Sequence, residues 1–101
     1  MPSKLSYIIK LRPKAEEDLE AIWDYTAETW SLDQAETYLR ALSEALDRLA
    51  ENPLLYPERK ELNPSVRIKP FKSHIILYRI DGETIDVIRV RHGREDWFSD
   101  A

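Results

Sequence analysis

Two stretches near the end of the chain alternate apolar and polar residues in the manner of β-strands. Residues 74–80 read H-I-I-L-Y-R-I, residues 85–92 read I-D-V-I-R-V-R-H, and the turn-forming sequence D-G-E-T separates them. Pairing Ile80 with Ile85 across this turn sets the register of a β-hairpin, because a slip of one residue would mix the two sets of side chains. This register predicts an apolar face formed by Ile75, Leu77, Ile88 and Val90. It predicts that the opposite face carries His74, Tyr78, Arg89 and Arg91.

The start of the chain predicts a strand followed directly by a helix. Residues 4–12 read K-L-S-Y-I-I-K-L-R and alternate loosely, with β-branched and aromatic residues among them. Pro13 suits the first turn of a helix, where its missing N–H costs nothing. The acidic residues 16–18 favour the positive end of the helix dipole. Residues that suit a buried face then recur at helical spacing as far as about Thr29: Ala15, Leu19, Ile22, Trp23 and Thr26.

A second helix is predicted to begin almost at once. Ser31 followed by Gln34 forms a capping box that starts it, and Pro53 ends it. Its apolar stripe is spaced by three and four residues: Leu32, Ala35, Leu39, Leu42, Leu46 and Leu49. Two helices joined by one or two residues form an antiparallel hairpin, and this hairpin needs a sheet to cover its apolar side.

The segment after the second helix is rich in proline. Prolines at positions 53, 57 and 64 predict a loop over residues 52–64. Beneath it we expect three packed side chains: Leu54, Leu55 and Tyr56. Residues 66–69 predict a short strand that turns its apolar residues inward and its two cations, Arg67 and Lys69, outward. Pro70 then ends this strand.

The element order βααβββ predicts an α+β fold, in which an N-terminal strand and an antiparallel helical hairpin pack on a small, mostly antiparallel sheet. A length of 101 residues fits a single domain over residues 1–101. The absence of cysteine excludes disulfides and thiolate metal sites, and two glycines are too few for a glycine-rich phosphate loop. A polar start and the lack of a long apolar run predict a cytoplasmic protein without membrane association.

Charge is distributed unevenly along the chain, although the formal net charge is −4. Residues 16–51 contain eleven acidic residues against two arginines, whereas residues 58–94 contain nine basic residues against five acidic ones. The first half is therefore acidic and the second half basic, which gives the molecule two electrostatically different sides. The acidic half is also what a solvated helical surface looks like, and this simpler interpretation stays open.

With the helices on one face of the sheet, the other face is predicted to carry most of the candidate chemistry: Arg67, Lys69, His74, Tyr78, Arg89 and Arg91. Such a surface fits phosphate binding and equally fits an ordinary solvated sheet. Cleavage of RNA would need two proton-transfer groups beside an arginine. The candidates for these groups are His74, Tyr78, His92 and Glu95. The two histidines are not at metal-ligand spacing, so we expect no metal and no cofactor.

The aromatic residues of the helical hairpin allow two interpretations. Trp23 and Trp30 are seven residues apart, so they lie on similar faces of the first helix or at its end. One interpretation is that both anchor the hairpin in the core. The other is that one of them lines a groove for a segment of a partner protein, together with Tyr38, because exposed aromatic side chains anchor interfaces.

Several segments resemble, in this order, the ParE-type toxins of the ParE/RelE superfamily: P-K-A-E-E-D-L-E-A-I-W-D-Y-T, W-S-L-D-Q-A-E-T-Y, L-A-E-N-P, R-K-E-L-N-P-S-V-R, H-I-I-L-Y-R-I and I-R-V-R-H-G-R-E-D. The resemblance covers nearly the whole chain, and the series of spacings is more specific than any one segment. It implies a helical hairpin against a three- or four-stranded sheet. It also implies the toxin of a bacterial type II toxin–antitoxin pair, neutralised by a ParD-like antitoxin.

The resemblance leaves the cellular target open. RelE-like members cleave messenger RNA on the ribosome, whereas ParE-like members with an assigned target act on DNA gyrase. This chain lacks the lysine cluster and the catalytic C-terminal Tyr or His of the RelE-like ribonucleases, and its net negative charge suits a ribosome ligand poorly. The resemblance therefore implies a non-enzymatic gyrase inhibitor. The alternatives are a RelE-like messenger-RNA endonuclease and a degenerate toxin that only binds its antitoxin.

Two sets of residues are candidates for binding these partners, and no residue is assigned a catalytic role. The target-binding candidates are Arg67, Lys69, His74, Arg89, Arg91, His92, Arg94 and Trp97. The antitoxin-binding candidates are Trp23, Trp30, Tyr38, Arg67 and Lys69. The resemblance implies no direct sequence-specific binding of DNA by this chain, with operator binding through the antitoxin.

Overall fold

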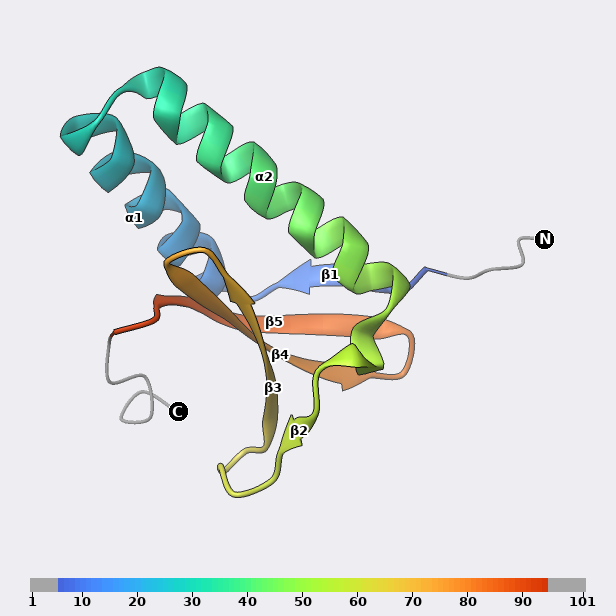
Figure 1. The fold of residues 1–101 in the computed structure, drawn as a ribbon. Coiled ribbons are helices and arrows are strands. Elements are labelled where there is room, and N and C mark those ends of the chain that lie inside the picture. Colours follow the sequence, from blue (N-terminus) through green and yellow to red (C-terminus); the bar gives the residue numbers. More distant parts are fainter. Residues whose placement is uncertain (1–5, 95–101) are drawn as a thin grey trace.

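The computed structural model of the chain describes residues 6–94 and shows the predicted α+β architecture (Figure 1). In chain order the elements are β1 (Ile8–Leu11), α1 (Pro13–Thr29), α2 (Leu32–Glu51), the 3₁₀ helix η1 (Pro53–Leu55), β2 (Glu58–Arg59), β3 (Val66–Phe71), β4 (His74–Asp81) and β5 (Thr84–His92). The predicted order is confirmed, and one short strand, β2, is added to it.

The five strands form one sheet in the order β1-β5-β4-β3-β2. β1 lies parallel to β5, and the other neighbouring pairs are antiparallel. The parallel pair is possible because a long connection, from α1 through β4, joins β1 to β5. β2 falls within the segment predicted as a loop and pairs with β3 over only two residues. A strand this short cannot be recognised from alternating apolar and polar residues.

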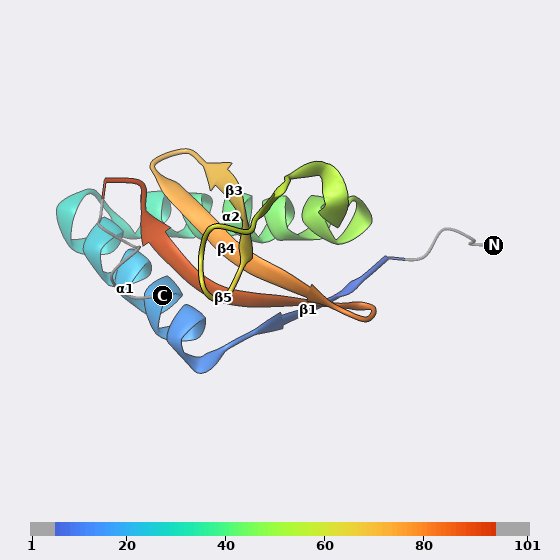
Figure 2. The ribbon, with the colours of Figure 1, turned by 90° about the horizontal axis from the view of Figure 1, so that it is seen from below.

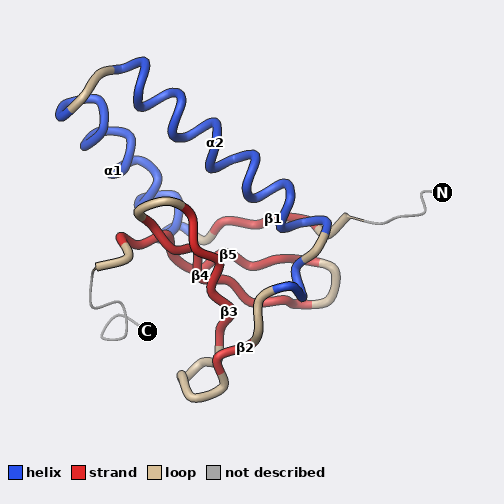
Figure 3. The backbone as a smooth tube through the Cα atoms, in the orientation of Figure 1, coloured by secondary structure: helices blue, strands red, loops and turns tan. Residues whose placement is uncertain are grey.

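Both helices begin where their sequence signals predict. α1 begins at Pro13, directly after β1, and α2 begins after Ser31. The Oγ of Ser31 accepts a hydrogen bond of 3.0 Å from the N–H of Gln34. This bond confirms Ser31 as the N-cap, because it satisfies an N–H group that has no partner within the helix. The N–H of Ser31 bonds to the carbonyl oxygen of Thr26 and not to Gln34, so the predicted capping box is only half formed. The helices lie side by side in an antiparallel hairpin (Figure 3).

The helical hairpin leaves one face of the sheet uncovered by helix. Seen from below, the central strands lie in front of α2, and neither α1 nor α2 lies over them (Figure 2). We call the sheet face that contacts the helices the helix face, and the other one the open face. Each has its own groove.

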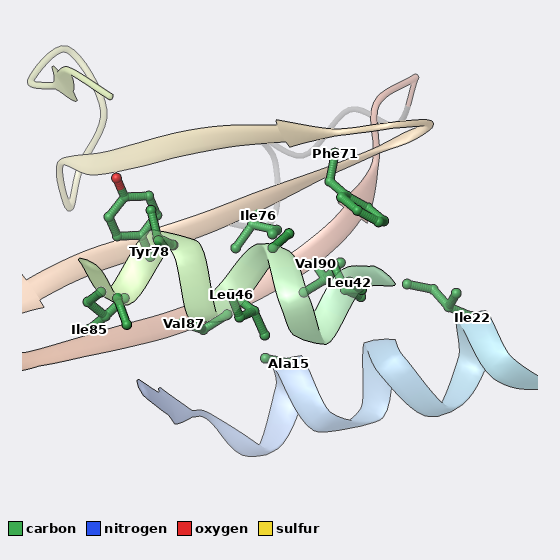
Figure 4. Packing of buried hydrophobic residues seen from close by; sticks show 13 residues of the cluster. Ala15, Ile22, Leu42, Leu46, Phe71, Ile76, Tyr78, Ile85, Val87 and Val90 are labelled. Carbon is green, nitrogen blue, oxygen red and sulfur yellow. The ribbon is translucent and has the colours of Figure 1, made fainter. Parts of the chain in front are cut away.

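The core lies between the helical hairpin and the helix face of β4 and β5 (Figure 4). Leu42 and Leu46 of α2 are buried, as predicted, and Leu39 is partly buried beside them. The strand residues of this core are Ile76, Tyr78, Ile85, Val87 and Val90. Of the four strand residues that were predicted to face the helices, only Val90 belongs to this cluster. The prediction was wrong for Ile75, Leu77 and Ile88.

The error lies in the choice of face, because Ile76, Tyr78 and Val87 meet the helices instead, and a β-bulge explains why Val90 still joins them. The hairpin register matches the prediction from the turn to the pair Tyr78–Val87, but Ile88 is skipped before the next pair. Ile88 is therefore an extra residue in β5, and the alternation of sides restarts after it. The bulge brings Val90 to the same side as Val87, which makes the helix face continuously apolar. Leu77 and Ile88 line a groove on the open face instead.

Tyr78 is fully buried in the core, although the sequence placed it on a polar sheet face. Its hydroxyl donates a hydrogen bond of 2.6 Å to the carbonyl oxygen of Pro53. Burial raises the pKa of Tyr78 to about 12, because the buried site disfavours the phenolate. Tyr78 thus stays neutral and ties the segment after α2 to the sheet, and its complete burial keeps its hydroxyl out of reach of a substrate.

The loop after α2 packs differently from the prediction. The side chains of Leu54 and Leu55 are 63% and 62% exposed, so the expectation that they lie beneath the loop was wrong. Tyr56 is partly buried against the core, as expected. The 3₁₀ turn explains the difference, because it directs Pro53 inward and the two leucines outward.

Leu42 and Leu32 make a matched pair for testing the packing of α2, since they share a helix and differ in burial. Leu42 is 1% exposed and Leu32 is 67% exposed. Leu42→Ala should lower the free energy of unfolding by about 2–5 kcal/mol through lost burial and a cavity. Leu32→Ala should change it by less than about 0.5 kcal/mol. Urea denaturation followed by circular dichroism measures both, and equal losses would contradict this orientation of the helix.

Candidate functional site

A groove of about 720 Å³ lies between the helical hairpin and the last residues of β5. We call it the hairpin groove and define it by Tyr25, Trp30, Tyr38, His74, Arg91 and His92. It exists because the outer halves of α1 and α2 project beyond the strands (Figure 1). No described strand lies under this part of the hairpin to fill the space with core side chains.

The helix side of the hairpin groove is aromatic. Tyr25 and Trp30 are 66% and 71% exposed, and both line the groove from the end of α1. Tyr38 of α2 lies deeper and packs edge-to-face on Phe71, with 5.4 Å between the ring centroids. Large apolar side chains that stay exposed around a concave surface are typical of sites that bind another protein.

The floor of the hairpin groove is polar. The hydroxyl of Tyr38 lies 2.7 Å from Nδ1 of His74, in hydrogen-bonding contact. The ring of His74 lies edge-to-face against that of His92, with 5.4 Å between the centroids. His74 pairs with His92 across the hairpin, and not with Arg91 as the predicted register had it, because of the bulge. Burial raises the pKa of Tyr38, so its hydroxyl keeps its proton at neutral pH.

The inner end of the hairpin groove is closed by an ion pair between Asp18 of α1 and Arg89 of β5. The guanidinium donates two hydrogen bonds to the carboxylate, at 2.8 Å from Nε and 2.9 Å from Nη2. The same carboxylate accepts a 2.9 Å hydrogen bond from the backbone N–H of Val90. β1 pairs with β5 only as far as Val87, so Asp18 takes the place of a strand neighbour beyond that residue. The side chains of the pair are only 19% and 15% exposed.

The sequence model of the family described as "ParE toxin of type II toxin-antitoxin system, parDE" matches residues 9–97. The chain belongs to the ParE toxin family. The resemblance that the segments of the sequence carried is thereby confirmed.

Curated relatives support the same family. The chain is 48% identical over 87 residues to "Toxin ParE1" of Mycobacterium tuberculosis, which covers 85% of this chain and 89% of the relative. It is 32% identical over 83 residues to "Toxin ParE1" of Caulobacter vibrioides, covering 82% and 85%. A solved structure described as "Chromosomal ParDE TA system from P. aeruginosa" matches with a TM-score of 0.75 over 86% of this chain and 96% of that chain. Its sequence identity is 21%, so this likeness shows a shared ParE fold.

The structure brings six of the predicted site residues of this ParE toxin together in the hairpin groove: Trp30, Tyr38, His74, Arg89, Arg91 and His92. Trp23 is partly buried and does not line the groove. The interpretation that both tryptophans anchor the hairpin in the core was wrong for Trp30, which is 71% exposed. Arg94 is exposed after β5 and donates its backbone N–H to Nδ1 of His92 at 3.2 Å. Trp97 lies outside the described residues.

Arg67 and Lys69 do not join this site. Arg67 donates a hydrogen bond to the carbonyl oxygen of Tyr56, and Nζ of Lys69 lies 3.2 Å from the hydroxyl of Tyr56 and 5.1 Å from the centroid of its ring. Pairing of Arg67 with Tyr78 puts these cations on the helix face of β3, beyond the ends of the helices. The prediction that they share one exposed face with Arg89 and Arg91 was therefore wrong.

Two contributors to the groove were missed at the level of sequence, Asp18 and Tyr25. A helical signal for them exists, because Asp18, Ile22 and Tyr25 stand at i, i+4 and i+7 on one side of α1. Trp23, a larger aromatic residue on the same helix, was predicted to be a site residue instead. The role of Asp18 could not be read from this spacing, since its partners Arg89 and Val90 lie about 70 positions away.

Two other features are absent from residues 6–94. Within this range, no three His, Cys, Asp or Glu side chains stand close enough together to hold a metal ion. None of the helices described there is both long and apolar enough to cross a bilayer.

Asp18→Ala should lower the free energy of unfolding by about 2–4 kcal/mol, because it removes the carboxylate that binds the largely buried Arg89 and the N–H of Val90. Asp18→Asn should lose less, since an amide oxygen still accepts one hydrogen bond. Asp24 lies exposed on the same helix and provides the control. Asp24→Ala should change the stability by less than about 0.5 kcal/mol. Equal unfolding midpoints in urea for Asp18→Ala and Asp24→Ala would refute the role given to Asp18.

Proposed function

We propose that this ParE toxin is neutralised by a ParD-like antitoxin, whose C-terminal segment binds in the hairpin groove. The observation that carries the proposal is the exposed aromatic pair, Tyr25 and Trp30, beside the cation Arg91. A segment with apolar side chains and some carboxylates would cover the aromatic side and meet Arg91 at the rim. The similar P. aeruginosa structure is of a ParDE system, which supports an antitoxin of this type.

The aromatic side chains should contribute most of the lifetime of this complex. Apolar anchors in the centre of an interface mainly set the dissociation rate, whereas charges at the rim mainly tune the association rate and its salt dependence. Trp30 and Tyr38 stand on opposite sides of the turn between the helices, so one segment can contact both. Of the antitoxin-binding candidates, we therefore assign the role to these two and leave out Trp23, Arg67 and Lys69.

Trp30→Ala and Tyr38→Ala should each raise the rate of antitoxin dissociation by about tenfold or more, as expected for aromatic anchors. Tyr38→Phe should have a smaller effect, because it keeps the ring and loses only the contact with His74. The control is Leu54→Ala, an exposed apolar residue outside the groove. Surface plasmon resonance with the antitoxin encoded beside the toxin measures these rates. If both alanine variants dissociate like the wild type, the antitoxin binds elsewhere.

We propose further that the toxin acts in the cytoplasm, without catalysis, by inhibiting DNA gyrase. Membership of the ParE family supports gyrase as the target. The net charge of −4 argues against the ribosome, because affinity for ribosomal RNA depends on contacts between cations and phosphates. The arrangement of the proton-transfer candidates also favours a binding toxin. Tyr78 is buried with a pKa of about 12, and His74 is engaged by Tyr38 and packed on His92. The residues we propose for target contact lie near the end of β5 and beyond it: Arg91, His92, Arg94 and Trp97.

Single histidine substitutions separate this proposal from its main alternative, messenger-RNA cleavage. Removing one general acid or base typically slows a nuclease by about 10²–10⁴, whereas a protein-binding surface tolerates the loss of one such group. His74→Ala and His92→Ala should each preserve growth arrest when the toxin is expressed alone. Arg91→Ala combined with Trp97→Ala should abolish it, because charge and apolar anchor are lost together.

The same variants should be assayed for gyrase supercoiling and for translation in vitro, with antitoxin binding as the check on folding. Wild-type toxin should block supercoiling and leave translation intact. Cleavage of ribosome-bound messenger RNA, together with loss of growth arrest in a single histidine variant, would end the gyrase proposal. A toxin that binds its antitoxin and affects neither process would be the degenerate form.

A further inference from the structure

A second groove, of about 400 Å³, lies on the open face of the sheet. We call it the open-face groove and define it by Lys14, Val66, Leu77, Arg79, Ile88 and Arg91. One wall is the turn that leads from β1 into α1, and the other includes Pro64 of the loop between β2 and β3. Its floor is formed by Val66 and Leu77, which are each only 3% exposed, and by the half-buried Ile88.

The rim of this groove is strongly basic in a chain whose net charge is −4. Among the described residues, five cations line the groove: Arg12, Lys14, Arg79, Arg89 and Arg91. Arg12 binds Asp86 with three contacts of 2.6 to 3.1 Å, and Arg89 binds Asp18. Within residues 6–94, Lys14 and Arg79 have no ion-pair partner within 4 Å. The fold has therefore gathered positive charge here that carboxylates of this part of the chain neutralise only in part.

The combination of floor and rim specifies the chemistry of an occupant. A nucleic-acid backbone would match the cations but would gain little from the accessible apolar surface of Pro13, Pro64 and Ile88. A purely apolar segment would leave the cations without a counter-charge. A segment that alternates apolar side chains with carboxylates satisfies both at once, because its apolar residues cover the floor while its acids meet Lys14 and Arg79.

We propose that the open-face groove docks an acidic, amphipathic segment of the toxin's target protein. This inference rests on the proposed function, in that the target is a protein. The antitoxin is assigned to the hairpin groove, which lies toward the helices, so the open-face groove is left for a different partner. Arg89 and Arg91 line both grooves. An antitoxin in the hairpin groove therefore contacts the strand residues that also form the rim of the target groove, which links neutralisation to target binding.

Charge reversal at Lys14 and Arg79 tests the proposal. The test variant is Lys14→Glu with Arg79→Glu, and the matched control is Arg40→Glu with Arg48→Glu on the exposed side of α2. Each double reversal makes the net charge more negative by the same amount, so net charge alone cannot separate them. An acid at position 14 lies in the first turn of α1, where it favours the helix dipole. A third variant, Lys14→Arg with Arg79→Lys, preserves the charge.

The test variant should need about tenfold more expression for growth arrest and should bind purified gyrase about tenfold more weakly. Its thermal unfolding midpoint and its affinity for the antitoxin, within about threefold, should match those of the wild type. The control and charge-preserving variants should behave like the wild type in every assay. A test variant that arrests growth as well as the wild type would overturn the proposal. Antitoxin affinity that falls together with toxicity would also overturn it, because the groove would then serve the antitoxin.

Two further outcomes separate this inference from the proposed function. If the wild type arrests growth without inhibiting or binding gyrase, the gyrase proposal fails. The growth arrest caused by the variants then shows by itself whether the open-face groove is needed for binding the target. If the wild type does not arrest growth, both the gyrase proposal and the groove proposal are overturned.

A labelled oligonucleotide of about 20 residues, as RNA or single-stranded DNA, provides a competing probe. Salt-sensitive binding of that probe to the wild type, lost in the test variant and kept in the control, would assign the groove to nucleic acid instead.

Discussion

The carboxylate of Asp18 makes the contacts on which the arrangement of helices, sheet and grooves depends. β1 ends its pairing with β5 at Val87, so the rest of β5 has α1 rather than a strand beside it. In this position, the carboxylate of Asp18 accepts a hydrogen bond from the N–H of Val90 and binds the guanidinium of Arg89. Because these groups are largely shielded from water, moving α1 away would leave the carboxylate and the N–H unpaired at a high cost in free energy. Asp18 therefore helps to fix the position of α1 at the hairpin groove, together with Ala15 and Ile22, which pack into the core.

The bulge at Ile88 is the second constraint, because it sets which side chains of β5 point to the helix face and which to the open face. Before the bulge, Ile85 and Val87 face the helices, and after it Val90 does so as well. A regular strand would have turned Val90 to the open face and Arg89 or Arg91 into the core, where an unpaired charge is not tolerated. The extra residue thus completes the core by adding Val90, while Ile88 lies at the floor of the open-face groove.

These two features give the molecule two grooves of different character. The hairpin groove offers exposed aromatic side chains around a Tyr38–His74 contact, and the open-face groove offers cations around an apolar floor. Under the proposed function, the first suits the long-lived complex with an antitoxin, whereas the second suits rapid capture of an acidic target segment. The strand that carries Arg89 and Arg91 belongs to both surfaces. If both proposals hold, a neutralising partner need not cover the whole toxin to affect target binding.

Local spacing and the order of motifs were enough to predict the main elements, the cap at Ser31, the stripe of α2 and the family. They also pointed to six residues that meet in the hairpin groove, since those residues are clustered in strands and helix ends. Three-dimensional packing alone established which face of the sheet meets the helices, the burial of Tyr78 and the position of Arg67 and Lys69 away from the site. A period of two cannot reveal an inserted residue, and one bulge reverses every side beyond it. The pairing of Asp18 with Arg89 joins residues 71 positions apart, and no local pattern encodes such a contact.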